Sequence, residues 1–259
     1  MYNNHMSLSL CCIASGSKGN CTFVTDGQSR IVIDLGISAT RAESALSALG
    51  VSADCDIVVT HSHSDHINGI KTFYKRHPGI VVHCQRESAR AVSSQTGVTP
   101  VIEGRSFKIG AITVTAIPVP HDVPCFGYIV ECGGKRAAVV TDIGAVEDRA
   151  LSALGGVDLL VIESNHDSDM LKRNVKYTPQ LKARIASDYG HLSNTDCASA
   201  CAFLATSGVK NFVLAHLSEE NNNPELARRE VECAITDAGA SANIVVASQD
   251  AMTGLFEIC

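Results

Sequence analysis

Three histidines and one aspartate fall within six consecutive residues of this chain: His61, His63, Asp65 and His66. Imidazole nitrogens and carboxylate oxygens together suit Zn, Mn or Fe as a bound ion. The residues just before them, Asp56–Thr60, form an apolar run that predicts a buried strand. In a loop after that strand, His61 and His63 can face one metal ion while Asp65 and His66 turn toward a second. The alternative is a solvated, histidine-rich turn.

The same segment, which reads HSHSDH, resembles the signature of the metallo-β-lactamase-fold hydrolases. Three later pieces match this family in order: PVPHD at Pro118–Asp122, TD at Thr141–Asp142 and LAHL at Leu214–Leu217. The resemblance implies an αββα sandwich, in which two mixed β-sheets are flanked by helices and the metals lie at one edge of the sheets.

The family pattern also implies a set of seven metal ligands. His61, His63 and His121 would hold the first metal. Asp65, His66 and His216 would hold the second, and Asp142 would bridge the two. Five neutral histidines and two aspartates give the pair a protein charge of −2 against about +4 from two divalent ions. The surplus positive charge suits an anionic substrate.

Within the superfamily, Asp142 stands where the best-known zinc lactamases carry a cysteine, which favours the phosphodiesterase or thioester-hydrolase branches. The third motif, PVPHDVPCFGY, is closer to the tRNA-processing and phosphodiesterase branch. Four further pieces resemble the YycJ/WalJ group: SGSKGN at Ser15–Asn20, ESNHD at Glu163–Asp167, GHLSN at Gly190–Asn194 and AHLSEENN at Ala215–Asn222. This resemblance implies a cytosolic 5′→3′ exodeoxyribonuclease with DNA as substrate, linked to mismatch repair and therefore to repair-protein partners.

Such an enzyme would use a hydroxide bridging two metals about 3.5–4 Å apart. Besides Asp65, two residues are candidates for the catalytic machinery. His191 can contact the phosphate or protonate the leaving oxygen, although it can equally cap a helix or bond within the core. Glu163 can accept a hydrogen bond from a metal-bound histidine, or take part in a plain buried ion pair. Asp34, at the end of a predicted strand, is expected beside the histidine segment as a supporting carboxylate, and its alternative is a turn cap.

Two segments are candidates for substrate binding. SGSKGN offers Ser15, Ser17, Lys18 and Asn20 around backbone N–H groups that can cradle a phosphate, although a simple hairpin turn has the same composition. Leu171–Arg184 carries five Lys or Arg and no acid. Its Lys172, Arg173 and Lys176 can contact a DNA backbone, and Tyr177 can stack on a base. A solvated charged face is the alternative there. His166 can touch substrate or orient a ligand.

Composition limits the function classes. The chain has 259 residues, 45% hydrophobic and 19% charged, which is consistent with one domain spanning residues 1–259. A net charge of −6 argues against a globally basic nucleic-acid coat, and the absence of Trp argues against broad aromatic platforms. Eleven scattered Cys without a CxxC pair favour reduced thiols in the cytoplasm, and no apolar run is long enough to span a membrane.

The predicted elements must place these side chains together. Strands are expected at Leu8–Ala14, Cys21–Thr25, Arg30–Asp34, Asp56–Thr60, Ile80–His83, Ser106–Ile109, Ala111–Ile117, Phe126–Cys132, Lys135–Thr141, Val157–Glu163, Asn211–Ala215, Asn243–Ala247 and Thr253–Glu257. Helices are expected at Ala39–Leu49, Ile67–Arg76, Gln85–Val92, Glu147–Leu154, Thr195–Ala205 and from Pro224 to Gly239. Strands alternating with helices predict an α/β fold of two mixed sheets with helices outside.

Three functions remain open from the sequence. The leading hypothesis is a two-metal phosphodiesterase that degrades DNA from the 5′ end. The second keeps the chemistry and changes the substrate to a small phosphodiester of the cyclic-nucleotide type, or to another ester. The third is a non-catalytic metal-binding or ligand-binding protein, which a full set of ligands together with His191 disfavours.

Overall fold

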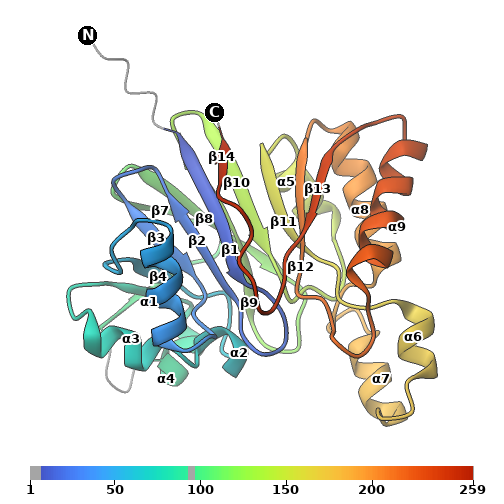
Figure 1. The fold of residues 1–259 in the computed structure, drawn as a ribbon, viewed down its shortest axis with the longest axis horizontal. Coiled ribbons are helices and arrows are strands. Elements are labelled where there is room, and N and C mark those ends of the chain that lie inside the picture. Colours follow the sequence, from blue (N-terminus) through green and yellow to red (C-terminus); the bar gives the residue numbers. More distant parts are fainter. Residues whose placement is uncertain (1–6, 93–96, 259) are drawn as a thin grey trace.

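The computed structural model describes residues 7–92 and 97–258, in which two seven-stranded sheets pack face to face between helices (Figure 1). The first sheet has the order β14-β1-β2-β3-β4-β5-β6, with β14 at Phe256–Ile258, β1 at Leu8–Ala14, β2 at Cys21–Thr25, β3 at Arg30–Ile33, β4 at Asp56–Val58, β5 at Val82–Cys84 and β6 at Val98–Pro100. The second has the order β13-β12-β11-β10-β9-β8-β7, with β13 at Asn243–Val246, β12 at Asn211–Ala215, β11 at Leu159–Glu163, β10 at Lys135–Val140, β9 at Cys125–Cys132, β8 at Ile112–Val119 and β7 at Ser106–Ile109.

The helices cover the outer faces of the two sheets (Figure 1). They are α1 at Ala39–Ala48, α2 at Ser64–Ile67, α3 at Ile70–Arg76, α4 at Arg86–Val92, α5 at Asp148–Leu154, α6 at Ser168–Arg173, α7 at Pro179–Ile185, α8 at Asn194–Thr206 and α9 at Pro224–Asp237. Helices α1 and α3 lie against the first sheet, and α5, α8 and α9 lie against the second. Helices α6 and α7 project past the end of the second sheet, at the lower right of Figure 1.

Three apolar layers hold this arrangement together. The middle layer lies between the sheets and contains residues from both, including Leu10 and Tyr128. One outer layer packs the first sheet against its helices, with Phe73 fully buried. The other packs the second sheet against its helices, with Leu204 and Val231 fully buried. Burial of apolar surface on both faces of both sheets is the driving force for an αββα sandwich, and the expected fold is confirmed.

Local expectations hold where turn and cap chemistry is strong. The hairpin between β9 and β10 turns at Gly133 and Gly134, which have φ of 58° and 79°. Helix α9 begins at Pro224 after Asn223, whose side chain accepts a hydrogen bond from the N–H of Leu226. The helix expected at Ile67–Arg76 is present as α3, which ends at Arg76 but begins three residues later, at Ile70. The short α2 before it, and β6, α6 and α7, lie outside the predicted elements.

The break between α2 and α3 has a packing reason. Gly69 approaches the segment after β3 so closely that an added Cβ would lie 2.0 Å from the carbonyl oxygen of Ile37. Its N–H donates to the carbonyl of Leu35 at 2.8 Å. Asn68 and Gly69 keep right-handed helical backbone angles, but the N–H of Gly69 bonds to Leu35 instead of to the preceding helical turn, and this divides α2 from α3. Asp65 and His66 lie on α2 rather than in the expected loop.

The ends of several strands bring the chemically interesting residues to one edge. In the first sheet, strand β3 is parallel to β4. In the second sheet, β10 is parallel to β11, and β11 is parallel to β12. Strand β8 runs in the same direction as β10, because both are antiparallel to β9. The carboxyl ends of strands that run in one direction share one edge of a sheet. Residues at or just after these ends are Asp34, His61, His121, Asp142, Glu163 and His216.

Three of these residues have an uncommon backbone conformation. Asp34, Asp142 and His216 have φ of 58°, 56° and 54°, and they are the non-glycine residues with positive φ in the described ranges. Such a conformation costs roughly 1–3 kcal/mol and persists only where the surroundings impose it. All three lie at the same edge of the sandwich. That edge is therefore built at the expense of stability, as functional sites commonly are.

Within the ranges described, none of the helices is both long enough and apolar enough to cross a membrane. The ten cysteines described there are unpaired, and nine of them are buried.

Close packing of Gly36 against the histidine segment gives a first testable prediction. A Cβ on Gly36 would lie 1.6 Å from the carbonyl oxygen of Asp65. We expect Gly36→Ala to lower the free energy of unfolding by about 2 kcal/mol or more, because backbone must move to admit the methyl group. Denaturant unfolding measures this. Gly79→Ala is the matched control, since nothing lies within 4 Å of its added Cβ. Equal stability of the two variants would contradict the close contact.

Candidate metal centre

The first group of potential ligands comprises three histidines from two segments. His61 and His63 follow β4 and His121 follows β8, and their ligand nitrogens lie within 4.8 Å of one another. The Nδ1 of His121 is 3.1 Å from the carbonyl oxygen of Gly190. A carbonyl only accepts, so this Nδ1 carries the proton and the Nε2 of the neutral ring presents a lone pair. The buried Nε2 atoms of His61 and His121 have no hydrogen-bond partner among the described groups.

The second group adds two carboxylates to two imidazoles. Asp65, His66, Asp142 and His216 also place their ligand atoms within 4.8 Å of one another. The Nε2 of His66 lies 3.1 Å from Asp142 Oδ2 and 3.4 Å from Asp65 Oδ2. Asp142 Oδ2 and His216 Nε2 are buried without a hydrogen-bond partner among the described groups, so the 3.1 Å contact lacks hydrogen-bond geometry. An unpaired buried oxygen and nitrogen are costly unless a ligand satisfies them.

Two fully buried carboxylates orient these imidazoles from behind. Asp34 Oδ2 is 2.7 Å from His66 Nδ1, and its two oxygens accept hydrogen bonds from the N–H and hydroxyl of Thr60, both at 2.8 Å. Glu163 Oε1 is 2.7 Å from His216 Nδ1 and 2.8 Å from His191 Nδ1. A carboxylate on Nδ1 fixes the ring orientation and makes the opposite nitrogen a better metal ligand.

Glu163 itself is not free to bind an ion. Its second oxygen accepts hydrogen bonds from the N–H of Ile143 at 2.8 Å and of Leu192 at 3.3 Å. Glu163, His191, Asp142 and His216 form a third compact group of possible ligands. Because both oxygens of Glu163 are already bonded, this group is an internal network that aims His191 and His216.

The two groups differ in charge. Burial lowers the pKa of His61 to about 2, and it also lowers the pKa of His121. Burial opposes protonation of His216 as well, but Asp142, Asp65 and Glu163 outweigh it and raise its pKa to about 10. Burial is likewise overcome at His66, where Asp142 and Asp34 raise the pKa well above the usual value. Burial therefore keeps His61 and His121 neutral, whereas the second group holds protons between its carboxylates.

The residues of both groups fit divalent metal ions. Nitrogen and carboxylate oxygen are the donors that such ions take. Four of these donor atoms are buried without a hydrogen-bond partner among the described groups, namely His61 Nε2, His121 Nε2, Asp142 Oδ2 and His216 Nε2. A cation also compensates the two carboxylates of the second group, which would otherwise need bound protons nearby.

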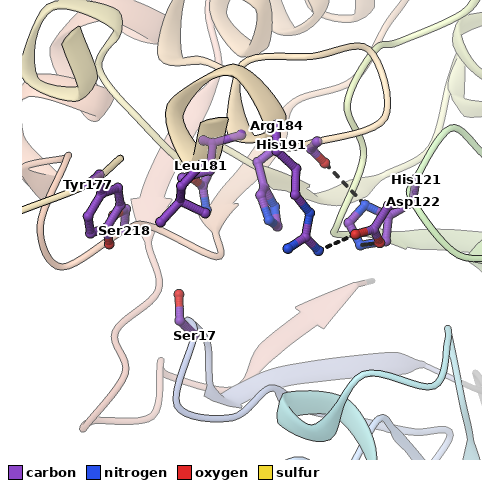
Figure 2. A pocket seen from close by; sticks show the side chains of 11 residues that line it. Ser17, His121, Asp122, Tyr177, Leu181, Arg184, His191 and Ser218 are labelled. Carbon is purple, nitrogen blue, oxygen red and sulfur yellow. Dashed lines mark hydrogen bonds and ion pairs between the residues drawn. The ribbon is translucent and has the colours of Figure 1, made fainter. Parts of the chain in front are cut away.

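A cleft of about 180 Å³ opens beside the centre (Figure 2). The labelled residues around it are Ser17, His121, Asp122, Tyr177, Leu181, Arg184, His191 and Ser218. Figure 2 shows Tyr177 at one end, His121 and Asp122 at the other, and Arg184 and His191 between them. Arg184 on α7 forms an ion pair with Asp122, whose carboxylate also lies 3.3 Å from His63 Nε2. One end of the cleft is therefore polar and metal-ligating, and the other is lined by side chains of Tyr177 and Leu181.

The residues expected to bind substrate occupy different places. Ser17 and Tyr177 line the cleft. Ser15 is buried and its hydroxyl accepts a hydrogen bond from the N–H of His216 at 2.8 Å, so it supports the centre. The buried Asn20 places its Nδ2 3.0 Å from His66 Nε2. His166 is buried outside the lining of the cleft.

The predicted cations lie on the surface around the cleft rather than in its lining. Lys18 pairs with Glu219, and Lys176 pairs with Glu220, at 2.8 and 2.7 Å. Lys172 and Arg173 both lie 3.7 Å from Asp169, in the first turn of α6. Exposed pairs of this kind are weak and exchange readily for other anions.

Sequence reasoning did not select seven of the residues that line the cleft: Asp122, Asn165, Leu181, Arg184, Ile185, Gly190 and Ser218. Asp122 and Ser218 stand inside quoted motifs, directly beside or close to a selected histidine. Arg184 is the last residue of the basic segment. It lies near the end of α7 and pairs with Asp122, and the sequence alone does not distinguish it from the other cations of the segment.

Opposite protonation of the two groups predicts that they lose metal at different pH values. A metal ion can bind the ring of His216 or His66 only after a proton has left that ring. Below the raised pKa of the ring, the affinity for the ion therefore falls by about ten-fold per pH unit for each such proton. We expect the affinity of the second group for Zn²⁺ to fall as the pH drops below about 10, the raised pKa of His216, and to fall more steeply than that of the first group, where burial lowers the pKa of His61 to about 2. Two variants separate the groups: His61→Ala keeps the second group, and His216→Ala keeps the first. Measuring the metal content of each variant across this pH range, at a fixed concentration of free Zn²⁺, gives the difference. The same pH dependence in both variants would contradict the assignment.

Comparison with known proteins agrees with this geometry. The model of the β-lactamase superfamily domain matches residues 29–217. Exodeoxyribonuclease YycJ of Bacillus anthracis is 34% identical over 90% of this chain and 91% of its own. Exodeoxyribonuclease WalJ of Streptococcus pneumoniae is 33% identical over 95% of this chain and 96% of its own.

Solved structures share the fold at lower identity. The metallo-β-lactamase fold protein YhfI from Bacillus subtilis superposes with a TM-score of 0.72 and 16% identity, covering 97% of this chain and 99% of its own. A diphosphatase of the PhnP family superposes with a TM-score of 0.67 and 17% identity, covering 98% and 99%. Fold, family match and overall identity agree: the chain belongs to the β-lactamase superfamily, in the group of its YycJ and WalJ relatives, and is a metal-dependent hydrolase.

Proposed function

We propose that this protein is a two-metal phosphodiesterase that acts as a 5′→3′ exodeoxyribonuclease. The observation that carries the proposal is the convergence of two groups of ligand atoms beside one cleft, with four of those atoms buried without a hydrogen-bond partner among the described groups. His61, His63 and His121 would hold one ion and Asp65, His66 and His216 the other, with Asp142 shared. Zn and Mn both suit these donors, and Fe does as well.

Two features favour DNA over a neutral ester. The YycJ and WalJ relatives, which this chain matches over nine-tenths of its length or more, are named exodeoxyribonucleases. Arg184 lies in the cleft beside the candidate metal ligands, where its planar guanidinium can form two parallel hydrogen bonds with a phosphate. In the absence of substrate, Asp122 occupies that guanidinium.

The chain's own residues have distinct tasks in this mechanism. Bound divalent ions supply a water of lowered pKa and neutralise charge that develops on the phosphoryl oxygens. Asp34 and Glu163 hold the imidazoles of His66 and His216 in position. Glu163 also fixes the proton of His191 on Nδ1 when that ring is neutral, which directs Nε2 toward the cleft. A protonated His191 can then donate from Nε2 to the leaving oxygen.

The size of the cleft favours one alternative substrate. Its volume of about 180 Å³ is below the roughly 300–1,000 Å³ of pockets that hold drug-sized ligands. A small cleft is what a small phosphodiester of the cyclic-nucleotide type would need, and such a compound is therefore the second candidate substrate. The experiment described next separates the two.

A time course on DNA labelled at the 5′ end of one strand, with Mn²⁺ supplied, tests the proposal. We expect labelled mononucleotide or very short product from the first time point. His61→Ala, which removes a ligand of the first group, should reduce cleavage by about a thousand-fold or more. Circular dichroism of the variant shows whether it remains folded. Uncut DNA together with hydrolysis of a small chromogenic diester would favour the alternative substrate, and inactivity on both would refute the phosphodiesterase.

A proton-donating role for His191 predicts a particular pH profile. Burial would lower the pKa of His191, but Glu163 and Asp142 raise it above its usual value. The acid form is therefore present at neutral pH and is lost as pH rises through the raised pKa, so kcat should fall on the alkaline side. We expect His191→Gln to lower kcat by about 10²–10⁴-fold and to remove that alkaline decline.

The exposed change Tyr189→Phe, two residues away, is the matched control and should leave both kcat and the profile unchanged. An unaltered alkaline decline in His191→Gln would rule out this residue as the proton donor.

A further inference from the structure

The carboxylate of Asp122 lies against the first group of candidate ligands. Asp122 directly follows His121 in the chain. Its Oδ1 lies 3.3 Å from the Nε2 of His121 and also 3.3 Å from the Nε2 of His63. One carboxylate oxygen therefore faces ring nitrogens of two of the three histidines that would hold the first ion.

Hydrogen bonding does not account for the contact between Asp122 and His121. The Nδ1 of His121 carries the proton of the ring, because it bonds to the carbonyl oxygen of Gly190 at 3.1 Å. The Nε2 of the same ring is buried without a hydrogen-bond partner among the described groups, although Asp122 Oδ1 is close by. A ring lone pair and a carboxylate oxygen at this separation repel each other unless a cation lies between them.

The two distances match a tetrahedral ion that these residues share. Zn²⁺ binds histidine nitrogen at about 2.0–2.1 Å and carboxylate oxygen at about 2.0–2.2 Å, with four ligands at the corners of a tetrahedron. Neighbouring ligand atoms in such a set are about 3.3–3.5 Å apart, and each points at the ion rather than at its neighbour. Asp122 Oδ1 has this spacing from His63 and His121. The Nε2 of His61, which is also buried without a partner among the described groups, supplies the remaining nitrogen.

The balance of charge between the two groups gives a second reason for a carboxylate at this position. The second group contains Asp65 in addition to Asp142, whereas the first group consists of three imidazoles. An ion in the first group would therefore have only a share of Asp142 to offset its charge. A carboxylate from Asp122 gives each ion one of its own, and this reduces the repulsion between two divalent ions held close together.

The turn that carries Asp122 is held in place on both sides. Strands β8 and β9 remain paired as far as Val119 and Cys125, so the residues between these two form a closed turn. The carbonyl oxygen of Pro120 accepts a hydrogen bond from the N–H of Gly144 at 2.9 Å. The side chain of Asp122 is 26% exposed. The fold therefore positions this carboxylate, which does not move freely on the surface.

We propose that Asp122 is a fourth protein ligand of the first metal ion and binds it through Oδ1, beside His61, His63 and His121. The other oxygen, Oδ2, is the one that pairs with Arg184, so a single carboxylate can serve both partners. This inference rests on the two-metal centre of the proposed function and adds a ligand to it. It concerns the ion and not the substrate, so it can be tested without DNA.

Binding of Co²⁺ to the first group alone tests the fourth ligand. The starting protein is His216→Ala, which removes a ligand of the second group, and Asp122→Ala is then added to it. Co²⁺ takes the same nitrogen and oxygen donors as Zn²⁺, and its visible absorption reports the number and kind of its ligands. We expect Asp122→Ala to weaken Co²⁺ binding by about ten-fold or more, since even a group that only supports a ligand contributes about 10–100-fold. The absorption spectrum should change as well.

Folding is checked separately from metal binding. Circular dichroism of the metal-free variants shows whether Asp122→Ala remains folded. Asp122→Asn keeps the shape of the side chain and replaces the carboxylate by a neutral amide. We expect it to bind Co²⁺ more weakly than the His216→Ala protein and more tightly than the Asp122→Ala variant, because an amide oxygen is a weaker donor than a carboxylate.

Arg184→Ala in the same His216→Ala background is the matched control. It breaks the ion pair with Asp122 and leaves the carboxylate in place. It should not weaken Co²⁺ binding or alter the spectrum, because it removes a positive charge near the ion. Equal weakening by Arg184→Ala and Asp122→Ala would overturn the proposal, and so would a spectrum that Asp122→Ala leaves unchanged. Failure of the His216→Ala protein itself to bind Co²⁺ would instead refute the first group, and the two-metal centre with it.

Discussion

The geometry of this centre depends on hydrogen bonds from imidazole Nδ1 atoms to buried acceptors. Glu163 receives two such rings, Asp34 receives one, and the carbonyl of Gly190 receives His121. Each bond sets which nitrogen is protonated and turns the opposite nitrogen toward the middle of the site. Without them, the rings would be free to rotate, and Asp34 and Glu163 would keep only their bonds to Thr60 and to backbone N–H groups.

That arrangement is supported by strain and by close packing. Asp34, Asp142 and His216 adopt left-handed backbone conformations at strand ends, and Gly36 allows the carbonyl of Asp65 to approach closer than any side chain would permit. The two apolar outer layers and the layer between the sheets supply the stability that offsets these costs. Burial of the apolar core therefore stabilises the strained edge. It holds the turns that carry the candidate ligands in conformations that they would not adopt alone.

Helices α6 and α7 form an arm, and residues of α7 line the cleft beside the candidate metal centre. Arg184 reaches the polar end of the cleft, and Tyr177 lines the other end (Figure 2). A hydrolase of this superfamily needs little from its protein beyond ligands and a proton donor to cleave a phosphodiester. Selection among substrates must then come from the shape and charge of the rim. In this chain the rim is formed by residues of α7 and of the segments around Asp122 and Ser218.

The sequence by itself determined the ligand types. Three imidazoles and a carboxylate, spaced as HSHSDH after an apolar strand, are typical of a metal site. The later histidines and Asp142 follow predicted strands in order. It also determined most strands, the Gly133–Gly134 hairpin and the Asn223 cap, since these depend on local chemistry. Tertiary structure alone decided that Ser15 supports His216, that α2 breaks from α3 at Gly69, and that Arg184 rather than its neighbouring cations enters the cleft. Those outcomes depend on contacts between residues far apart in the chain, and no local pattern encodes which of several similar side chains a distant segment will meet.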